Sequence, residues 1–108
     1  MYTIIDGKKY NIIIMNTFFK RLIGLMFKKD KITNIYMFPR CSSIHTYFMK
    51  QNIDVCILSK NYKINYIISS LKPGKVIIKK GYYTLEMPLG LSNKLKVGEK
   101  LVIKSDAT

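Results

Sequence analysis

Apolar residues along the 108-residue chain fall into short runs separated by turn residues. In TIIDGKKYNIII, two β-branched segments stand on either side of Asp6 and Gly7. Both central residues of a type I′ turn need a positive φ angle, so Asp-Gly between such segments predicts a β-hairpin. Residues 53–59 and 63–68 flank a short connection in which Asn61 can take the left-handed conformation, which predicts a second hairpin.

The remaining apolar runs predict further strands and one helix. Helical spacing from Phe18 to Met26 places the apolar side chains on one face, which predicts a helix over residues 17–26. A short helical turn is predicted near residues 92–95. Further strands are expected at 35–38, 43–49, 76–79, 82–87 and 100–104. Seven or eight short strands with close turns favour a sandwich or barrel with one helix in the N-terminal half.

The length limits the chain to one domain, expected over residues 1–104 with a frayed tail at 105–108. No segment approaches the roughly twenty apolar residues needed to cross a bilayer. The first residues lack the order of a secretory signal, because the turn at Asp6 and Gly7 divides the apolar residues. A small soluble protein of the cytoplasm is therefore expected.

The net charge of +13 comes from nineteen basic and six acidic residues. A surplus of this size suits nucleic acid, an anionic surface or an acidic protein. Only Arg21 and Arg40 are arginines, however, and the guanidinium fork is preferred for reading bases and for bidentate phosphate contacts. Lys, Ile and Asn are abundant while Ala occurs once, as expected when codons are rich in A and T. A solvated basic face is therefore favoured over a nucleic-acid groove.

Five separated motifs resemble one known family. They are RLIGLMFKK, IYMFPR, IHTYFMKQNIDVCIL, LKPGK and YYTLEMPLGLSNKLKVGEKL, which together span about four fifths of the chain. Their order is similar to that of domain of unknown function 192. The resemblance implies a mainly β, jelly-roll-like domain with no established reaction, and suggests an accessory role beside pilus or secretion assemblies. The chain departs from the family pattern at Lys28, Glu99 and Gln51-Asn52, where Arg, Asp and an aromatic-Pro pair are usual.

Positions that match the family motifs supply a polar set of candidate binding residues. The set consists of Arg21, His45, Lys50, Asp54 and Glu86. Asp54 and Glu86 stand in apolar strand runs, where a buried carboxylate needs partners or a raised pKa. Arg21, Lys50 or backbone amides could supply those partners, and such pairing would be structural as easily as functional.

Other chemistry has little support in the sequence. His45 is the only histidine, and Cys41 and Cys56 form no CxxC pair, so neither a metal site nor a cofactor is expected. Cys41 with His45 is conceivable as a nucleophile and base, but four residues of extended chain span about 13 Å. No glycine pattern of the phosphate-cradling kind occurs.

Two functions of different classes follow. The first is a non-catalytic binding or accessory module that presents a polar pocket around His45 and Asp54, or a β edge, to a protein partner or a small anionic ligand. The second is binding of nucleic acid or an anionic surface by the lysine-rich exterior. A small enzyme acting through Asp54, Glu86 or His45 is a third, less favoured reading.

Overall fold

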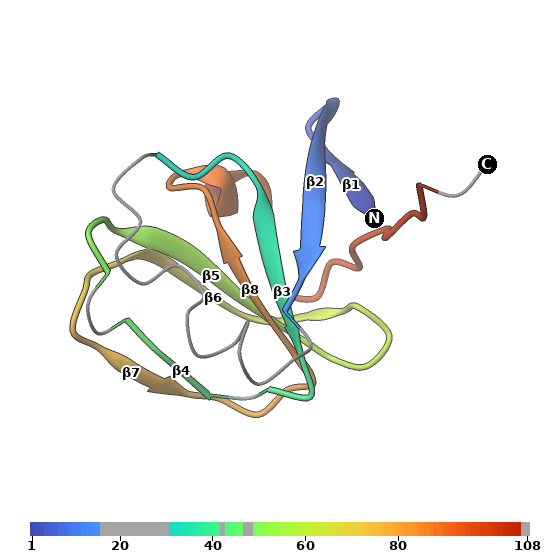
Figure 1. Ribbon diagram of the computed structural model, residues 1–108. Coiled ribbons are helices and arrows are strands. Elements are labelled where there is room, and N and C mark those ends of the chain that lie inside the picture. Colours follow the sequence, from blue (N-terminus) through green and yellow to red (C-terminus); the bar gives the residue numbers. More distant parts are fainter. Residues whose placement is uncertain (16–30, 42, 47–48, 107–108) are drawn as a thin grey trace.

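The computed structural model describes residues 1–15, 31–41, 43–46 and 49–106, and it is built mainly of β-strands (Figure 1). Six strands form one sheet in the order β1-β2-β3-β8-β5-β6. Their bounds are Tyr2–Ile5, Lys8–Ile14, Ile35–Pro39, Tyr83–Met87, Ile53–Leu58 and Ile64–Leu71 in that order. Strands β4 (Ser43–His45) and β7 (Val76–Ile78) form a separate two-stranded sheet. One 3₁₀ helix, η1, spans Leu91–Lys94.

Both predicted hairpins are confirmed. Asp6 and Gly7 have φ angles of 51° and 78°, as the type I′ turn between β1 and β2 requires. Strands β5 and β6 pair antiparallel as expected. The left-handed residue of their connection is Tyr62, with a φ of 69°, so the assignment of this role to Asn61 was wrong. The helical turn predicted near residues 92–95 corresponds to η1.

The described strands do not close into a barrel, so that alternative was wrong for this part of the chain. Strands β1 and β6 are the two edges of the large sheet and pair with different neighbours. β2 and β3 are parallel, which makes the sheet mixed. The jelly-roll connectivity stays a prediction. The helix predicted over residues 17–26 lies outside the described residues. No helix within the described ranges is long and apolar enough to span a membrane.

The last predicted strand, 100–104, is not a continuous strand. This segment instead makes two isolated antiparallel bridges, one between Lys63 and Lys100 and one between Tyr2 and Lys104. Strand β4 is also shorter than predicted, because Thr46, which follows His45, hydrogen-bonds the loop before β7 instead of continuing the strand. The Thr46 hydroxyl donates to the carbonyl of Lys72 at 2.7 Å and accepts from the amide of Lys75 at 2.8 Å.

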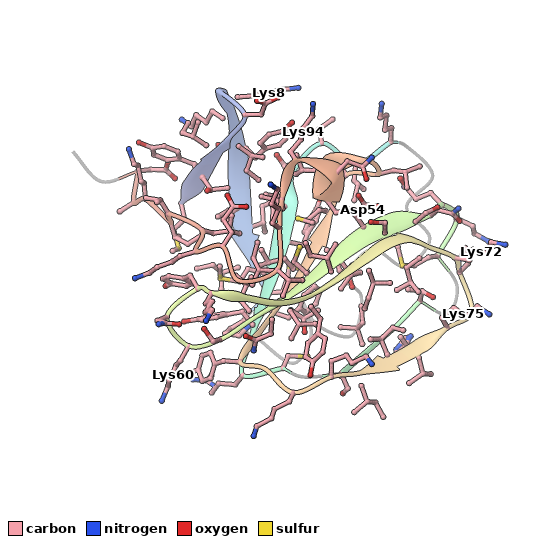
Figure 2. The ribbon with its side chains drawn as sticks, turned by 180° about the vertical axis from the view of Figure 1, so that it is seen from behind. Lys8, Asp54, Lys60, Lys72, Lys75 and Lys94 are labelled. Atoms are coloured by element: carbon pink, nitrogen blue, oxygen red, sulfur yellow. The ribbon has the colours of Figure 1, made fainter. Side chains whose placement is uncertain are left out.

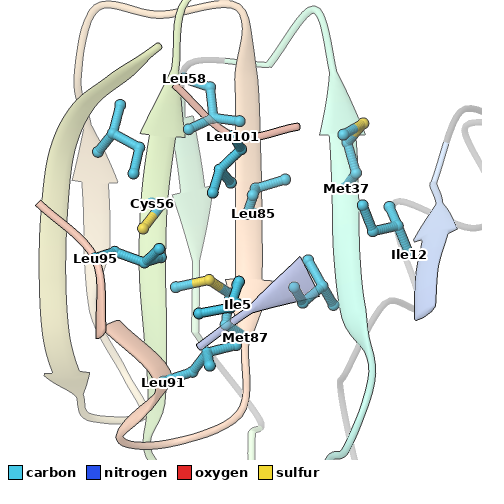
Figure 3. Packing of buried hydrophobic residues seen from close by; sticks show 12 residues of the cluster. Ile5, Ile12, Met37, Cys56, Leu58, Leu85, Met87, Leu91, Leu95 and Leu101 are labelled. Atoms are coloured by element: carbon cyan, nitrogen blue, oxygen red, sulfur yellow. The ribbon is translucent and has the colours of Figure 1, made fainter. Parts of the chain in front are cut away.

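Each face of the large sheet is buried under its own hydrophobic core. The first core, shown in Figure 3, consists of Ile5, Ile12, Ile35, Met37, Cys56, Leu58, Ile64, Leu85, Met87, Leu91, Leu95 and Leu101. The second core consists of Met15, Ile32, Tyr36, Phe38, Ile44, Met49, Ile53, Val55, Ile57 and Leu71. Successive strand residues point to opposite faces, so alternate positions of β5 belong to different cores, and alternate positions of β8 face different cores. This alternation decides the environment of both buried carboxyl groups.

Candidate functional site

Asp54 anchors helix η1 to the large sheet (Figure 2). Its side chain lies on the same face of β5 as the first core and is buried. One carboxylate oxygen accepts the backbone N–H of Ser70 at 2.9 Å. The other accepts the N–H groups of Gly90 and Ser92, each at 2.9 Å, and the Ser92 hydroxyl at 2.6 Å. These donors satisfy the buried carboxylate within the protein. Asp54 therefore has a structural role, holding η1 and the end of β6 to β5, and we call this arrangement the clasp.

Glu86 lies on the opposite face of the sheet, over the second core. Its cross-strand neighbours are Tyr36 on β3 and Val55 on β5, both members of that core. The side chain is buried, and its Oε2 atom has no hydrogen-bond partner among the described residues. Burial alone raises the pKa of Glu86 to about 8, because desolvation penalises the charged form. The carboxyl group is therefore mostly neutral at pH 7.

The other three predicted residues do not join either carboxyl group in the described structure. His45 is exposed on β4, while its neighbour Ile44 turns inward to the second core. Lys50 is exposed as well, and Arg21 lies outside the described residues. Asp54 faces the first core, so the sheet separates it from the layer that carries His45. The pocket predicted around His45 and Asp54 is thus not formed by the described residues.

The cysteines and acidic residues provide no metal centre within the described ranges, where His, Cys, Asp and Glu do not gather in threes. Cys56 is fully buried, and burial, with the nearby charges of Asp54 and Glu99, raises the pKa of its thiol to about 12. Cys41 donates its Sγ hydrogen to the carbonyl of Ser43 at 2.9 Å.

A basic groove, which sequence reasoning did not single out, opens where the β5–β6 connection meets the segment between β7 and β8. We call it the lysine groove. Its volume is about 630 Å³. Lysine, tyrosine and small residues line it, namely Ser59, Lys60, Lys63, Ile64, Asn65, Tyr66, Lys80, Gly81, Tyr82, Val97 and Gly98. No carboxylate is among these residues.

Backbone contacts hold the walls of the lysine groove in place. The amide of Tyr82 donates to the carbonyl of Leu58 at 2.8 Å, and the amide of Gly98 donates to the carbonyl of Ile64 at 2.8 Å. Gly81 makes the closest approach, because a Cβ atom there would stand 2.3 Å from the Cγ2 atom of Ile57. A larger residue here would have to displace the Ile57 side chain, so glycine allows this segment, which carries Lys80 and Tyr82, to pack closely on β5.

Cations and aromatic rings are interleaved along this groove. The Lys60 ammonium lies 5.3 Å from the ring centroid of Tyr82. The ammonium of Lys79, which precedes the groove residue Lys80, lies 5.4 Å from the ring centroid of Tyr66. Glu99 follows the groove residue Gly98, but its carboxylate accepts the backbone N–H of Lys96 at 3.0 Å. The groove therefore offers positive charge and ring faces without a lining acid, a combination suited to anions. The sequence signal was the occurrence of lysines close to tyrosines in two segments, residues 60–66 and 79–82.

Two solved structures share this fold. A proposed transcription regulator from Sinorhizobium meliloti 1021 superposes with a TM-score of 0.79 at 16% identity, covering 94% of this chain and 89% of that one. A protein of unknown function from Novosphingobium aromaticivorans superposes with a TM-score of 0.78, also at 16% identity, covering 94% and 82%. Identity at this level shows a common fold and nothing more about activity.

Two sequence relatives are more similar. UPF0127 protein PH1112 of Pyrococcus horikoshii is 35% identical, with 82% of this chain and 83% of the relative covered. UPF0127 protein PF1050 of Pyrococcus furiosus is 32% identical, with 94% and 95% covered. The family model for DUF192, described as "Uncharacterized ACR", matches residues 1–103. The resemblance inferred from the five motifs is thus confirmed, and the chain belongs to the DUF192 family.

Proposed function

We propose that this protein is a non-catalytic binding module whose lysine groove takes a small anionic ligand, with a phosphorylated compound as the best chemical fit. The observation that carries the proposal is the composition of the groove wall. Lys60, Lys63 and Lys80 line it together with two tyrosines, and no carboxylate is among the lining residues. We therefore assign the ligand site to this groove and not to the predicted pocket around His45 and Asp54.

The size and donor chemistry of the groove support a small ligand. A volume of about 630 Å³ falls inside the roughly 300–1,000 Å³ typical of small-molecule sites. Lysine ammonium groups act as mobile point charges and bind phosphate without the fixed fork of arginine. The rings of Tyr66 and Tyr82 offer flat surfaces on which a planar group of the ligand can lie.

Single-stranded nucleic acid is the second candidate, and the same tyrosines favour it. Bases stack on aromatic side chains while lysines follow the phosphates, a mode that needs no base-specific contacts. One relative in fold is named as a proposed transcription regulator, although at 16% identity. The two candidates differ in salt dependence, because an extended strand that contacts several phosphates gives a steep fall of affinity with salt.

The test is a titration of the ¹⁵N-labelled protein at about 50 mM salt with inorganic pyrophosphate, ATP and a single-stranded oligonucleotide. We expect amide shifts at the groove with pyrophosphate and ATP, and at least tenfold weaker binding in Lys60→Ala/Lys63→Ala/Lys80→Ala. Lys8→Ala/Lys9→Ala/Lys104→Ala is the matched control, since it removes the same charge from exposed positions at the β1–β2 hairpin and the C-terminal segment.

Absence of shifts with all three probes would refute the proposed groove. Equal losses in the two triple variants would show only diffuse attraction to the net charge. Binding of the oligonucleotide alone, with a steep salt slope, would favour the second candidate. A cytoplasmic location and an accessory role beside pilus or secretion assemblies remain part of the proposal, and recovery of such partners by crosslinking in the source cells would test them.

A further inference from the structure

The outer face of the two-stranded β4–β7 sheet carries exposed apolar side chains. Val76 and Ile78 are 52% and 73% exposed, and Ile78 is the most exposed large apolar residue in the described part of the chain. Val76 lies opposite His45 and Ile78 opposite Ser43 in the antiparallel register, so these four side chains share one face. Ile44 and Ile77 form the pair between them and turn inward to the second core.

This face stands apart from the large sheet. Figure 1 shows β4 and β7 as a layer of their own, along one rim of the molecule. Exposed lysines flank β7 at both ends, Lys72 and Lys75 before it and Lys79 and Lys80 after it. Figure 2 places Lys72 and Lys75 together at one end of this layer.

The sequence around β4 and β7 holds one acidic residue, Asp54, which is buried. Residues 31–53 and 55–85, which include β4 and β7, hold neither Asp nor Glu. We propose that the β4–β7 face docks on an anionic lipid bilayer, with Val76 and Ile78 entering the interface and the flanking lysines contacting the headgroups. Apolar insertion combined with lysine attraction is the physical basis of reversible binding to such surfaces.

A second copy of the chain fits this face poorly. Two copies facing each other would bring their lysines together, with no carboxylate in either strand to neutralise them. A stable interface buries about 800 Å² on each partner, whereas three-residue strands extend only about 10 Å. A pair of branched side chains with lysines before and after it along the chain suits shallow insertion into a bilayer better than it suits a protein interface. This inference differs from the proposed function in the apolar pair Val76 and Ile78, which does not line the lysine groove, although Lys80 belongs to both surfaces.

The test measures sedimentation with vesicles of phosphatidylcholine alone and with added phosphatidylserine. We expect binding only to the anionic vesicles, reduced about fivefold for each of Lys75→Ala and Lys79→Ala. Val76→Ser/Ile78→Ser should weaken binding at least tenfold. Its matched control is Ile4→Ser/Val102→Ser, which replaces two other exposed aliphatic side chains that are 46% and 62% exposed. Circular dichroism verifies that both pairs fold.

The chain has no tryptophan, so a single introduced one reports the depth of insertion. The Ile78→Trp variant should show a blue shift with anionic vesicles and quenching by brominated lipid, while Val102→Trp should show neither. Failure to bind anionic vesicles at about 50 mM salt would overturn the proposal. So would binding that ignores the serine substitutions at 76 and 78, or equal quenching of both tryptophans. Tight binding of polyglutamate through the same pair without lipid insertion would assign the face to an acidic protein and also overturn it.

Discussion

Replacing Glu86 by Gln tests whether a neutral carboxyl group is buried in the second core. Glu86 is only 5% exposed, and its Oε2 atom lacks a partner among the described residues. Glutamine has nearly the same shape as a protonated glutamate but cannot ionise. The substitution therefore removes the cost of keeping this group neutral and leaves its packing almost unchanged.

The sign and size follow from the two pKa values. In the folded protein the pKa of Glu86 is about 8, against an ordinary value of 4.5. Between these values the unfolded chain is ionised while the folded chain retains its proton, so the free energy of unfolding falls as the pH rises. At 1.36 kcal/mol per pKa unit the loss amounts to roughly 3 kcal/mol at pH 7 and approaches about 5 kcal/mol above pH 8.

Urea unfolding at pH 5, 6, 7, 8 and 9, at constant ionic strength, measures the effect. We expect the difference in unfolding free energy between Glu86→Gln and the natural chain to grow in favour of the variant across this range. Any fixed cost of the amide shifts the whole curve and leaves the slope intact. Glu99→Gln serves as the control, because it makes the same chemical change at an exposed carboxyl group, where burial does not oppose ionisation. A flat difference, or one favouring the natural chain at high pH, would refute the buried neutral state.

Three further predictions concern the scaffold. Asp54→Ala should lower the free energy of unfolding by about 3 kcal/mol in urea titrations, since several buried donors lose their charged acceptor; a loss under about 1 kcal/mol would contradict the clasp. Gly81→Ala should cost about 1–3 kcal/mol because the new Cβ atom would lie only 2.3 Å from the Cγ2 atom of Ile57, and unchanged stability would show that the two segments separate easily. In the native protein a maleimide reagent should label Cys41 well before Cys56, whose pKa of about 12 keeps it protonated; equal rates in mass spectra would contradict this.

Local sequence rules predicted the hairpins because the required information lies within a few residues. Asp6 and Gly7 select a turn type, and the alternation on either side selects the register. The left-handed conformation at Tyr62 was missed for a tertiary reason. The Tyr62 carbonyl accepts the amide of Leu101 at 3.0 Å, a contact made by the distant C-terminal segment. Propensity favoured Asn61, and long-range pairing selected its neighbour.

The sequence pattern does not distinguish Asp54 from Glu86, yet in the structure they lie on opposite faces of the large sheet. Both residues stand in apolar strand runs. The alternation along a strand predicts which residues share a face, but it does not predict which segments cover that face. The donors to Asp54 come from Ser70, Gly90 and Ser92, which are 16 to 38 residues away. No spacing rule links such positions, because sheet order brings them together. The same limitation explains why the lysine groove was missed, since its walls come from three distant segments.

The positions of the carboxylates say more about the function of the basic surface than the number of lysines does. Codon composition can raise the number of lysines, but it does not decide where acids stand in space. Of the exposed acids in the described ranges, Asp6 pairs with Lys94 at 3.4 Å, Asp106 pairs with the N-terminal ammonium, and Glu99 binds the amide of Lys96. Asp54 and Glu86 are buried. None of these five carboxylates lines the lysine groove or belongs to the β4–β7 strands, so the positive potential there is not neutralised locally. The two basic surfaces therefore differ in the residues that stand beside their lysines. In the lysine groove these are tyrosine rings, and on β7 they are branched aliphatic side chains.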